Sequence, residues 1–527
     1  MLYIFSLVRK YQEIITRVAY IAVSVSPFLS LYIFHWINTP EGYIPTGFIQ
    51  SDMPYYAANG REIFESGNGF SYPNPYDTSP TKPDIYFHWF PWLLGVGIKF
   101  FNIDPGILFF VFGIVSSVLC AWLTLIIVEK ILPNLQFRYP LFLLVMWGGG
   151  VLCLSAVVAN LFNSESPSLF TNILRYDPFG GMWFLNWGRN LIYPTEATYH
   201  AIVALIWIAV LNQRWWLAVF GTVGLATTHP FSGVQHLLIM IFFLSIVLVI
   251  YKSPKITKYW ITLSITLVIF LLYYKVFLVS FPEHQAIHKD WSLNWVLPIE
   301  SIFLAYSPVG ILAIMRIIYD RRRLPIEVLF FATCFLTSLL LAKHELFMDS
   351  MQPLHFTRGY LWTPLIFIAL PFIQRGLISL QQRMSNILFM LISVILASFA
   401  IGDNLVFVKL NTNRPLGYYL TFEERNLLTQ VNLLDDSGIM LTLNRKLGYL
   451  SATYTSVTPY VGHHFLTPKR EEKLQNIKYW KANQYDLLEQ ENIDYILIKI
   501  ENIPSDFDLS KWDTKLKSKN YILLVKQ

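Results

Sequence analysis

Residues 51–89 read SDMPYYAANGREIFESGNGFSYPNPYDTSPTKPDIYFHW and belong to a long polar loop that follows one apolar run. The loop extends from Asn38 to about His88, and its acids include Asp52 and Asp84, among many aromatic side chains. Gly, Pro, Asn and Ser, which favour turns, are dense within it. A simple membrane anchor needs neither acids nor aromatic groups in its first long loop. The stretch therefore predicts chemistry at a membrane surface.

The composition places the chain among polytopic membrane proteins. Of its 527 residues, 54% are hydrophobic and only 14% are charged, and the mean hydropathy is +0.45, which excludes an ordinary soluble domain. The first apolar run lacks a small-residue cleavage site, so we expect a first span and not a removed signal peptide. All three cysteines lie in apolar stretches and are expected to be core residues without a disulfide, metal or nucleophilic role: Cys120, Cys153 and Cys334.

Apolar runs predict about eleven membrane-spanning helices, since a span needs roughly 17–25 mostly apolar residues. They cover residues 18–37, 106–128, 139–158, 197–212, 215–228, 233–251, 260–280, 299–319, 326–342, 359–374 and 385–402. A partly re-entrant path is an alternative for the fourth and fifth. Trp89 to Phe101 is too short to span and mixes Trp, Pro and Lys, which indicates an interfacial helix.

A set of basic residues close to the ends of these spans falls on one side if the spans alternate. They are Arg9, Lys10, Arg17, Lys130, Arg138, Arg214, Lys252, Lys255, Lys258, Arg321, Arg322, Arg323, Arg375 and Arg383. The positive-inside rule makes that side cytoplasmic. The N-terminus is then cytoplasmic, and the large loops 38–105 and 159–196 are extracytoplasmic. Low charge and the expected lack of disulfides favour the bacterial inner (plasma) membrane.

A change of composition near residue 403 predicts two domains, a transmembrane domain over 1–402 and a tail domain over 403–527. The tail contains strand-like stretches at 438–443, 494–500 and 521–527. Thr467 and Pro468 are expected to open a helix as N-cap and first-turn proline, and a second helix is expected over 485–491. Helices alternating with short apolar strands predict a small extracytoplasmic α/β domain.

Asp52 is the leading catalytic candidate, because it precedes a predicted helix from Tyr55 to Glu65 in the loop quoted above. One interpretation is a helix cap, since a carboxylate is favoured at a helix start. The other is a general base that takes a proton from an acceptor hydroxyl or amine. Asp84, at the membrane entry, is a candidate substrate or metal contact, with a turn or capping role as the alternative.

The second large loop supplies another acid, Asp177. It could pair with Arg175 as a surface ion pair of little energetic value. Alternatively, Asp177 and Asp52 share a divalent cation, Mg²⁺ or Mn²⁺, because carboxylate and phosphate oxygens suit a hard cation. Arg189 in the same loop is a further candidate for binding substrate.

Three basic groups lie near the expected outer face. Arg358 suits a bidentate grip on a phosphate, and Lys275 lies within the seventh predicted span, where a charge is costly without a function. Snorkelling to the headgroups is the alternative for both. His229 is a candidate phosphate or metal contact, or a hydrogen-bonded core histidine. His463 and His464 are a weak metal signal without further ligands, or they contact an acceptor at a cavity mouth.

Several functions lack their motifs. The chain contains no Walker loop, no dinucleotide glycine pattern and no G-x-S-x-G elbow. ATP-driven transport and serine hydrolysis are therefore not supported, and no nucleic-acid partner is expected.

The architecture resembles the GT-C superfamily of integral membrane glycosyltransferases, which includes protein O-mannosyltransferases and aminoarabinose transferases. The shared pattern is one span, an outer loop with an early acid and interfacial helices, a second large outer loop and an outer α/β tail. The tail stretch YVGHHFLTPKREEKLQNIKYW (460–480), followed by IDYILI (493–498), is similar to the tails of many uncharacterised members. The resemblance covers nearly the whole chain as architecture.

The resemblance implies roles for single residues. Asp52 would act as base or bind a metal, and Asp177 would be the second acid, with Glu165 as its competitor. Arg358 would hold the lipid phosphate. The chain departs from better-known patterns, because Met53 and not a second acid follows Asp52. Residues 343–345 read Lys-His-Glu, and there is no Trp-Trp-Asp motif.

The implied reaction is an inverting transfer of a sugar from a polyprenyl-phosphate donor in the bilayer to an acceptor, with membrane lipids as surroundings. Such a donor needs no nucleotide motif. Two rival functions stay open. A transporter or flippase for a lipid-linked glycan would carry charges deep in several spans, and a non-catalytic component of polysaccharide export would tolerate the loss of Asp52.

Overall fold

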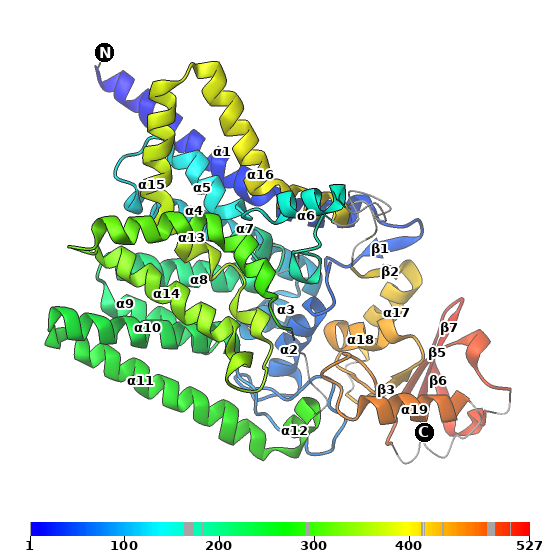
Figure 1. The fold of residues 1–527 in the computed structure, drawn as a ribbon. Helices are drawn as coiled ribbons and strands as arrows, with labels where there is room; N and C mark the ends of the chain where they lie inside the picture. The colour runs from blue at the N-terminus through cyan, green and yellow to red at the C-terminus, as the bar shows by residue number, and fades with distance from the viewer. Residues whose placement is uncertain are drawn as a thin grey trace. The chain divides into compact units, whose positions relative to one another are not determined.

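The structure is a computed structural model that describes residues 2–162, 173–181, 184–289, 295–412, 415, 417–434, 437–481, 491–505 and 507–527. Its elements, labelled in Figure 1, fall into two compact units. The first unit comprises Met1–Leu31, Phe112–Phe270 and Leu293–Arg414. The second comprises Tyr32–Val111, Leu271–Ser292 and Pro415–Gln527. The predicted domains, 1–402 and 403–527, are continuous in sequence and stay a prediction.

Eight helical stretches of the described chain are long and apolar enough to cross a membrane. They are α1 (Leu2–Ile37), α4 (Pro105–Ile131), α8 (Pro194–Leu211), α10 (Pro230–Tyr251), α11 (Thr257–Leu272) with the turns around it, α13 (Ile299–Asp320), α15 (Trp362–Arg383) and α16 (Asn386–Thr412). Each coincides with a predicted span. The chain is therefore a polytopic α-helical membrane protein.

Of the other three predicted spans, 326–342 coincides with helix α14 (Ile326–Ala342), whose 17 residues are at the lower limit for a span. Helix α9 (Trp215–Ala226) has 12 residues and is shorter than a typical span. The span predicted over 139–158 is a bent pair, α5 (Arg138–Trp147) and α6 (Leu152–Leu161), which meet at 63°.

Three glycines cause this bend. A Cβ on Gly148 would overlap the Trp362 ring, and a Cβ on Gly149 would overlap the Asp403 carboxylate. Gly150 has a φ of +67°, which residues with a side chain rarely adopt. The break thus lets a bulky ring and a carboxylate approach the backbone of the first unit.

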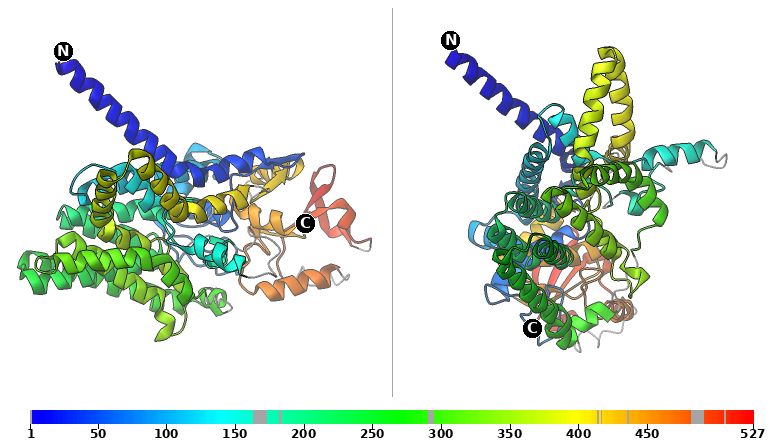
Figure 2. Two further views of the ribbon diagram at one scale, coloured as in Figure 1. Left: turned by 45° about the horizontal axis from the view of Figure 1, so that its top comes forward. Right: turned by 60° about the vertical axis from the view of Figure 1, so that its left-hand side comes forward.

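Within the first unit, helices pack in the succession α8, α9, α10, α14, α15 and α13. Helices α15 and α16 form a hairpin, which the right-hand view of Figure 2 shows in yellow. Helix α11 exposes a row of apolar side chains, Ile261, Ile265, Val268 and Ile269. Such a row suits contact with lipid chains.

The second unit contains the long first loop. Helices α2 (Met53–Glu65) and α3 (Trp89–Phe101) lie in contact, because Gly60 and Gly95 let their backbones approach so closely that a Cβ on either would overlap the other. Helix α2 also packs on α18 (Arg445–Tyr454). The prediction of a helix over Trp89 to Phe101 is confirmed.

The tail of the second unit builds a five-stranded sheet in the order β4-β3-β5-β7-β6. Its strands are β3 (Ile439–Thr442), β4 (Thr458–Pro459), β5 (Tyr495–Lys499), β6 (Trp512–Lys517) and β7 (Tyr521–Lys526). Strand β3 runs parallel to β4 and β5, whereas β7 is antiparallel to β5 and β6. The three predicted strands are confirmed as β3, β5 and β7, which have the most continuous apolar runs because they are central.

Three further elements complete the tail. Strand β2 (Tyr419–Thr421) pairs with β1 (Tyr43–Pro45) of the first loop. Helix α17 (Phe422–Leu433) begins with a capping box made by Thr421 and Glu424. These contacts tie the start of the tail to the first loop.

The predicted N-cap at Thr467 is wrong. Helix α19 (Arg470–Lys481) begins three residues later, after Lys469 in a left-handed conformation. The Thr467 hydroxyl instead donates to the His463 carbonyl oxygen and accepts from the Gly462 amide, which closes a local turn. The helix predicted over 485–491 lies almost wholly outside the described residues.

Candidate functional site

Asp52 occupies the N-cap position of α2, but its side chain makes no capping hydrogen bond. The capping alternative is therefore wrong. Oδ1 accepts from His463 Nε2 at 3.2 Å and Oδ2 accepts from Gln50 Nε2 at 3.3 Å, while the side chain stays 44% exposed. Asp52 thus presents an accessible carboxylate that is held from one side.

The tautomer of His463 follows from its two contacts. Its Nδ1 accepts a hydrogen bond from the Phe465 backbone N–H at 3.1 Å, so this nitrogen carries no proton in the neutral ring. The proton is then on Nε2, which donates to Asp52 Oδ1. Oδ2 faces only a long hydrogen bond and is the oxygen open to a proton from a substrate.

The environment keeps Asp52 ionised. Burial is the largest single influence and raises its pKa, but the hydrogen bond and charge of His463, the hydrogen bond from Gln50 and the charge of His464 together outweigh it. The net pKa lies below the ordinary value of 3.8. An aromatic cluster of Tyr55, Tyr76 and Tyr449 surrounds the pair, and each ring lies within 6 Å of the His463 ring.

His463, beside Asp52, is poorly suited to ligate a divalent cation such as Mg²⁺ or Mn²⁺. Asp52, His463 and His464 place one ligand atom each within 4.8 Å of one another. However, a histidine that ligates through Nε2 carries its proton on Nδ1 and donates it to an acceptor. Here Nδ1 of His463 faces the Phe465 N–H, which is itself a donor. His463 is therefore suited to hold Asp52 and not a metal.

Replacing His463 with Phe should move the acid limb of activity to higher pH. The ring stays, but the hydrogen bond that lowers the pKa of Asp52 is lost, while the burial that raises it remains. The pH dependence of kcat/KM would measure the change. His464→Phe is the matched control and should move the limb less, because its charge is the weakest contribution. An unmoved limb in His463→Phe would contradict this role.

Asp84 and Lys275 also lie in the second unit, both exposed. Burial and the charge of Glu62 raise the pKa of Asp84. Lys275 lies in a π-helical turn (Tyr273–Phe277) at the end of α11, a feature that often marks a functional position. In that turn, the Tyr273 hydroxyl donates to the Ile85 carbonyl oxygen at 2.8 Å, which joins the turn to the first loop. Their roles in substrate binding stay predictions.

In the first unit, Asp177 pairs with Arg189 and not with Arg175, whose guanidinium lies over the Tyr176 ring. Arg189 is fully buried and donates four hydrogen bonds, to Asp177, the Gly181 carbonyl oxygen, Asp403 and Asn404. A guanidinium has five N–H groups, so protein acceptors take nearly all of them. These contacts favour a structural role for Arg189 over phosphate binding.

The same cluster closes the break between α5 and α6. The Trp147 and Gly148 carbonyl oxygens, freed by the break, accept from the Asn186 side-chain amide at 3.1 and 2.8 Å. The Asn404 amide also donates to Trp147. Because unpaired backbone groups are costly away from water, these amides stabilise the bend.

Arg358 lies 6% exposed between η6 (Pro353–Phe356) and α15. Its guanidinium forms an ion pair with Glu196 and a 2.6 Å hydrogen bond to Nδ1 of His355. The Arg358 carbonyl oxygen lies 2.7 Å from His200 Nε2. A phosphate at Arg358 would thus join a guanidinium that already has two partners, and this predicted role stays a prediction.

His229 is the N-cap of α10. Its Nδ1 accepts from the Ser232 backbone N–H at 3.2 Å, and its ring stacks on Tyr199 at 4.6 Å between centroids. These contacts favour the interpretation of His229 as a hydrogen-bonded core histidine. Substrate binding by His229 stays a prediction.

The sequence analysis missed three partners, namely His463 for Asp52, Asp403 for Arg189 and Glu196 for Arg358. Each of these residues is distant from its partner in the sequence or belongs to a stretch whose pattern predicts only a helix. Glu165 lies outside the described residues. Asp52 and Asp177 belong to different units, so the shared cation stays a prediction, and the contacts of each acid argue against it.

Comparisons with known proteins add a likeness of structure. No family model matches the chain, and no curated protein matches it. The archaeal oligosaccharyltransferase AglB from Archaeoglobus fulgidus, solved with an inhibitory peptide and a dolichol-phosphate, matches with a TM-score of 0.45 and 10% identity over 94% of this chain and 70% of AglB. ArnT from Cupriavidus metallidurans bound to undecaprenyl phosphate matches with a TM-score of 0.47 and 10% identity over 96% of this chain and 97% of ArnT. Apo ArnT matches with a TM-score of 0.46 and 11% identity over the same shares.

The solved structures belong to the GT-C superfamily that the sequence resembles. The lipid phosphates and the peptide are ligands of those proteins. The basis for a proposed function is the arrangement of this chain's own residues.

Proposed function

We propose that the chain is a GT-C-type membrane glycosyltransferase that moves a sugar from a polyprenyl-phosphate donor to an acceptor on the extracytoplasmic face. The observation that carries the proposal is the Asp52 carboxylate, which is ionised, accessible and freed from helix capping, with His463 fixing one of its oxygens. This is the arrangement that a general base requires.

The proposed transfer uses Asp52 Oδ2 as the proton acceptor. The acceptor hydroxyl or amine loses its proton to Oδ2 as it attacks the anomeric carbon. A bond forms between that carbon and the acceptor atom, and the bond to the phosphate oxygen breaks, which inverts the configuration. The lipid phosphate leaves with the bonding electron pair, and its charge needs a cationic contact.

His463 positions Asp52 in this proposal. Its Nε2–H fixes Oδ1, so that the other oxygen faces the acceptor in one orientation. The lowered pKa makes Asp52 a weak base, and a weak base is enough where the acceptor proton leaves only as the new bond forms.

Glycan and glycolipid profiling of cells with and without the chain tests the activity. A transferase predicts that cells lacking the chain lose one glycan and accumulate its lipid-linked donor on the outer leaflet. Accumulation of a complete lipid-linked glycan on the cytoplasmic leaflet would instead indicate a flippase and overturn the proposal.

A further inference from the structure

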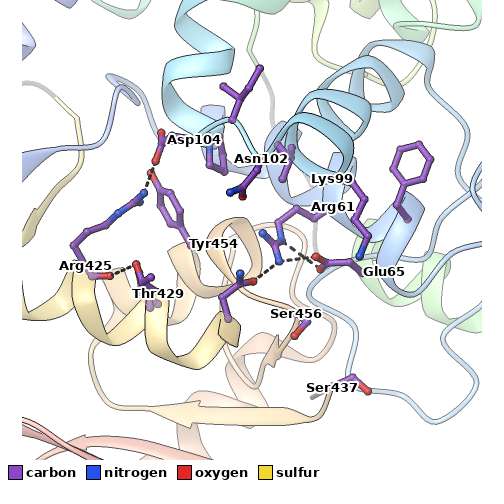
Figure 3. A pocket seen from close by; sticks show the side chains of 16 residues that line it. Arg61, Glu65, Lys99, Asn102, Asp104, Arg425, Thr429, Ser437, Tyr454 and Ser456 are labelled. Atoms are coloured by element: carbon purple, nitrogen blue, oxygen red, sulfur yellow. Dashed lines mark hydrogen bonds and ion pairs between the residues drawn. The ribbon is translucent and has the colours of Figure 1, made fainter. Parts of the chain in front are cut away.

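A polar cavity of 520 Å³ lies in the second unit, at the far end of α2 from Asp52. Figure 3 shows it with Arg61, Glu65 and Lys99 on one side and Asp104, Arg425 and Tyr454 on the other. Its volume lies within the range of small-ligand sites, about 300–1,000 Å³. The proposed transfer reaction does not use this cavity.

The charges that line the cavity do not cancel. Arg61 Nη2 bonds to Glu65 Oε1 at 2.5 Å and to the Asn432 side-chain oxygen at 2.7 Å. Arg425 forms an ion pair with Asp104 and lies over the Tyr454 ring. The third basic group, Lys99, is exposed and has no ion pair within the described part of the chain. Three basic and two acidic side chains leave one positive charge.

The pairs explain why Lys99 carries this surplus. Asp104 Oδ1 accepts from the Gly106 and Ile107 backbone N–H groups, so Asp104 caps α4 while its other oxygen holds Arg425. Glu65 is held by two nitrogens of Arg61. Both carboxylates therefore have arginine partners. The charge of Lys99 also acts on Glu65, but Lys99 forms no ion pair in the described part of the chain and can meet an anion.

Apolar side chains lie at the cavity, where Phe64 is part of the lining and the Phe100 ring packs against Phe64 at 5.3 Å between centroids. Phe100 and Phe101 directly follow Lys99 in α3 and are 66% and 70% exposed, and Ile107 in the first turn of α4 is 53% exposed. Exposed rings and aliphatic groups beside a lysine are typical of a surface at the level of lipid headgroups. A ligand with an anionic head and an apolar tail fits both features.

We propose that this cavity binds the headgroup of an anionic glycerophospholipid. The phosphodiester carries one negative charge, which matches the surplus charge of the lining, and Lys99 contacts it. Polar side chains such as Asn102, Thr429 and Ser456 accept and donate hydrogen bonds to headgroup hydroxyls. The acyl chains lie along the exposed ring of Phe100, which packs against Phe64 of the lining.

The bound lipid is not the donor of the proposed transfer. Arg61 and Glu65 are nine and thirteen residues beyond Asp52 in α2, which is ~14–20 Å at 1.5 Å per residue. A phosphate at Lys99 is thus too far away for its substituent to react at Asp52. The proposal of a lipid site is therefore independent of the proposed transfer reaction.

Titration calorimetry on the delipidated full chain in a non-ionic detergent tests the proposal. The probes are dihexanoyl phosphatidylglycerol, dihexanoyl phosphatidylcholine and glycerol phosphate, which separate headgroup charge from acyl chains. We expect phosphatidylglycerol to bind most tightly and Lys99→Gln to weaken it about fivefold, the ratio that corresponds to ~1 kcal/mol per lysine near a membrane surface. Lys515→Gln, an exposed lysine of β6 in the same unit, should leave the affinity unchanged.

Each other result overturns part of the proposal. Equal binding of the two lipids would remove the charge selectivity, and glycerol phosphate binding as tightly as the lipid would make the ligand a soluble phosphate ester. Unchanged affinity in Lys99→Gln would place the lipid elsewhere. Phe100→Ser gives a second measurement, since it should weaken binding of the lipid and leave binding of glycerol phosphate unaffected.

Discussion

Replacing Asp52 with Asn is expected to lower the rate of sugar transfer by about 10²–10⁴-fold, the usual contribution of a general base. The amide keeps the size of the side chain, and its oxygen still accepts from His463 Nε2–H. It cannot take a proton from the acceptor at neutral pH. The loss should therefore appear in kcat/KM, measured as polyprenyl phosphate released in membrane vesicles.

The same variant should fold and insert as the wild type does. The Asp52 side chain is 44% exposed and caps no helix, so its replacement should change the free energy of unfolding by no more than about 0.5 kcal/mol. Glu41→Gln, an exposed acid of the same loop, is the matched control and should keep full activity. Normal transfer by Asp52→Asn would exclude Asp52 as the base.

The membrane architecture was predictable because its signal is local. A run of apolar residues identifies a span without any knowledge of its neighbours, and each of the eight longest helical stretches was predicted. The bend at Gly148–Gly150 was missed, since apolar length does not register a break that depends on contacts with Trp362 and Asp403. The tail strands β3, β5 and β7 were also local signals.

The candidate site was less predictable, because its contacts join distant parts of the chain. Asp52 stood out as an acid at a helix start, but its partner His463 lies 411 residues away. In the sequence, the His463–His464 pair is only a weak indication of a metal site. In the structure, His463 Nδ1 accepts from a backbone N–H, which favours a role for His463 in positioning Asp52. Similarly, Asp403 directly follows a predicted span, and nothing in the sequence indicates its ion pair with Arg189.

The second large effect concerns the buried cluster of the first unit. Arg189→Met should lower the free energy of unfolding by about 3–5 kcal/mol, because removing one partner of a buried ion pair leaves uncompensated charge. Here two carboxylates, Asp177 and Asp403, would lose the same guanidinium. Thermal unfolding of the purified chain in detergent should show a clearly lower Tm.

A matched control separates this effect from the loss of any arginine. Arg383→Met changes an exposed arginine at the end of α15 and should leave the Tm nearly unchanged. Adding Asp177→Asn and Asp403→Asn to Arg189→Met removes both buried charges and should recover much of the loss. Failure of this rescue would assign the loss to packing against Phe407, over which the guanidinium lies at 5.3 Å. An unchanged Tm in Arg189→Met alone would mean that the cluster is not structural.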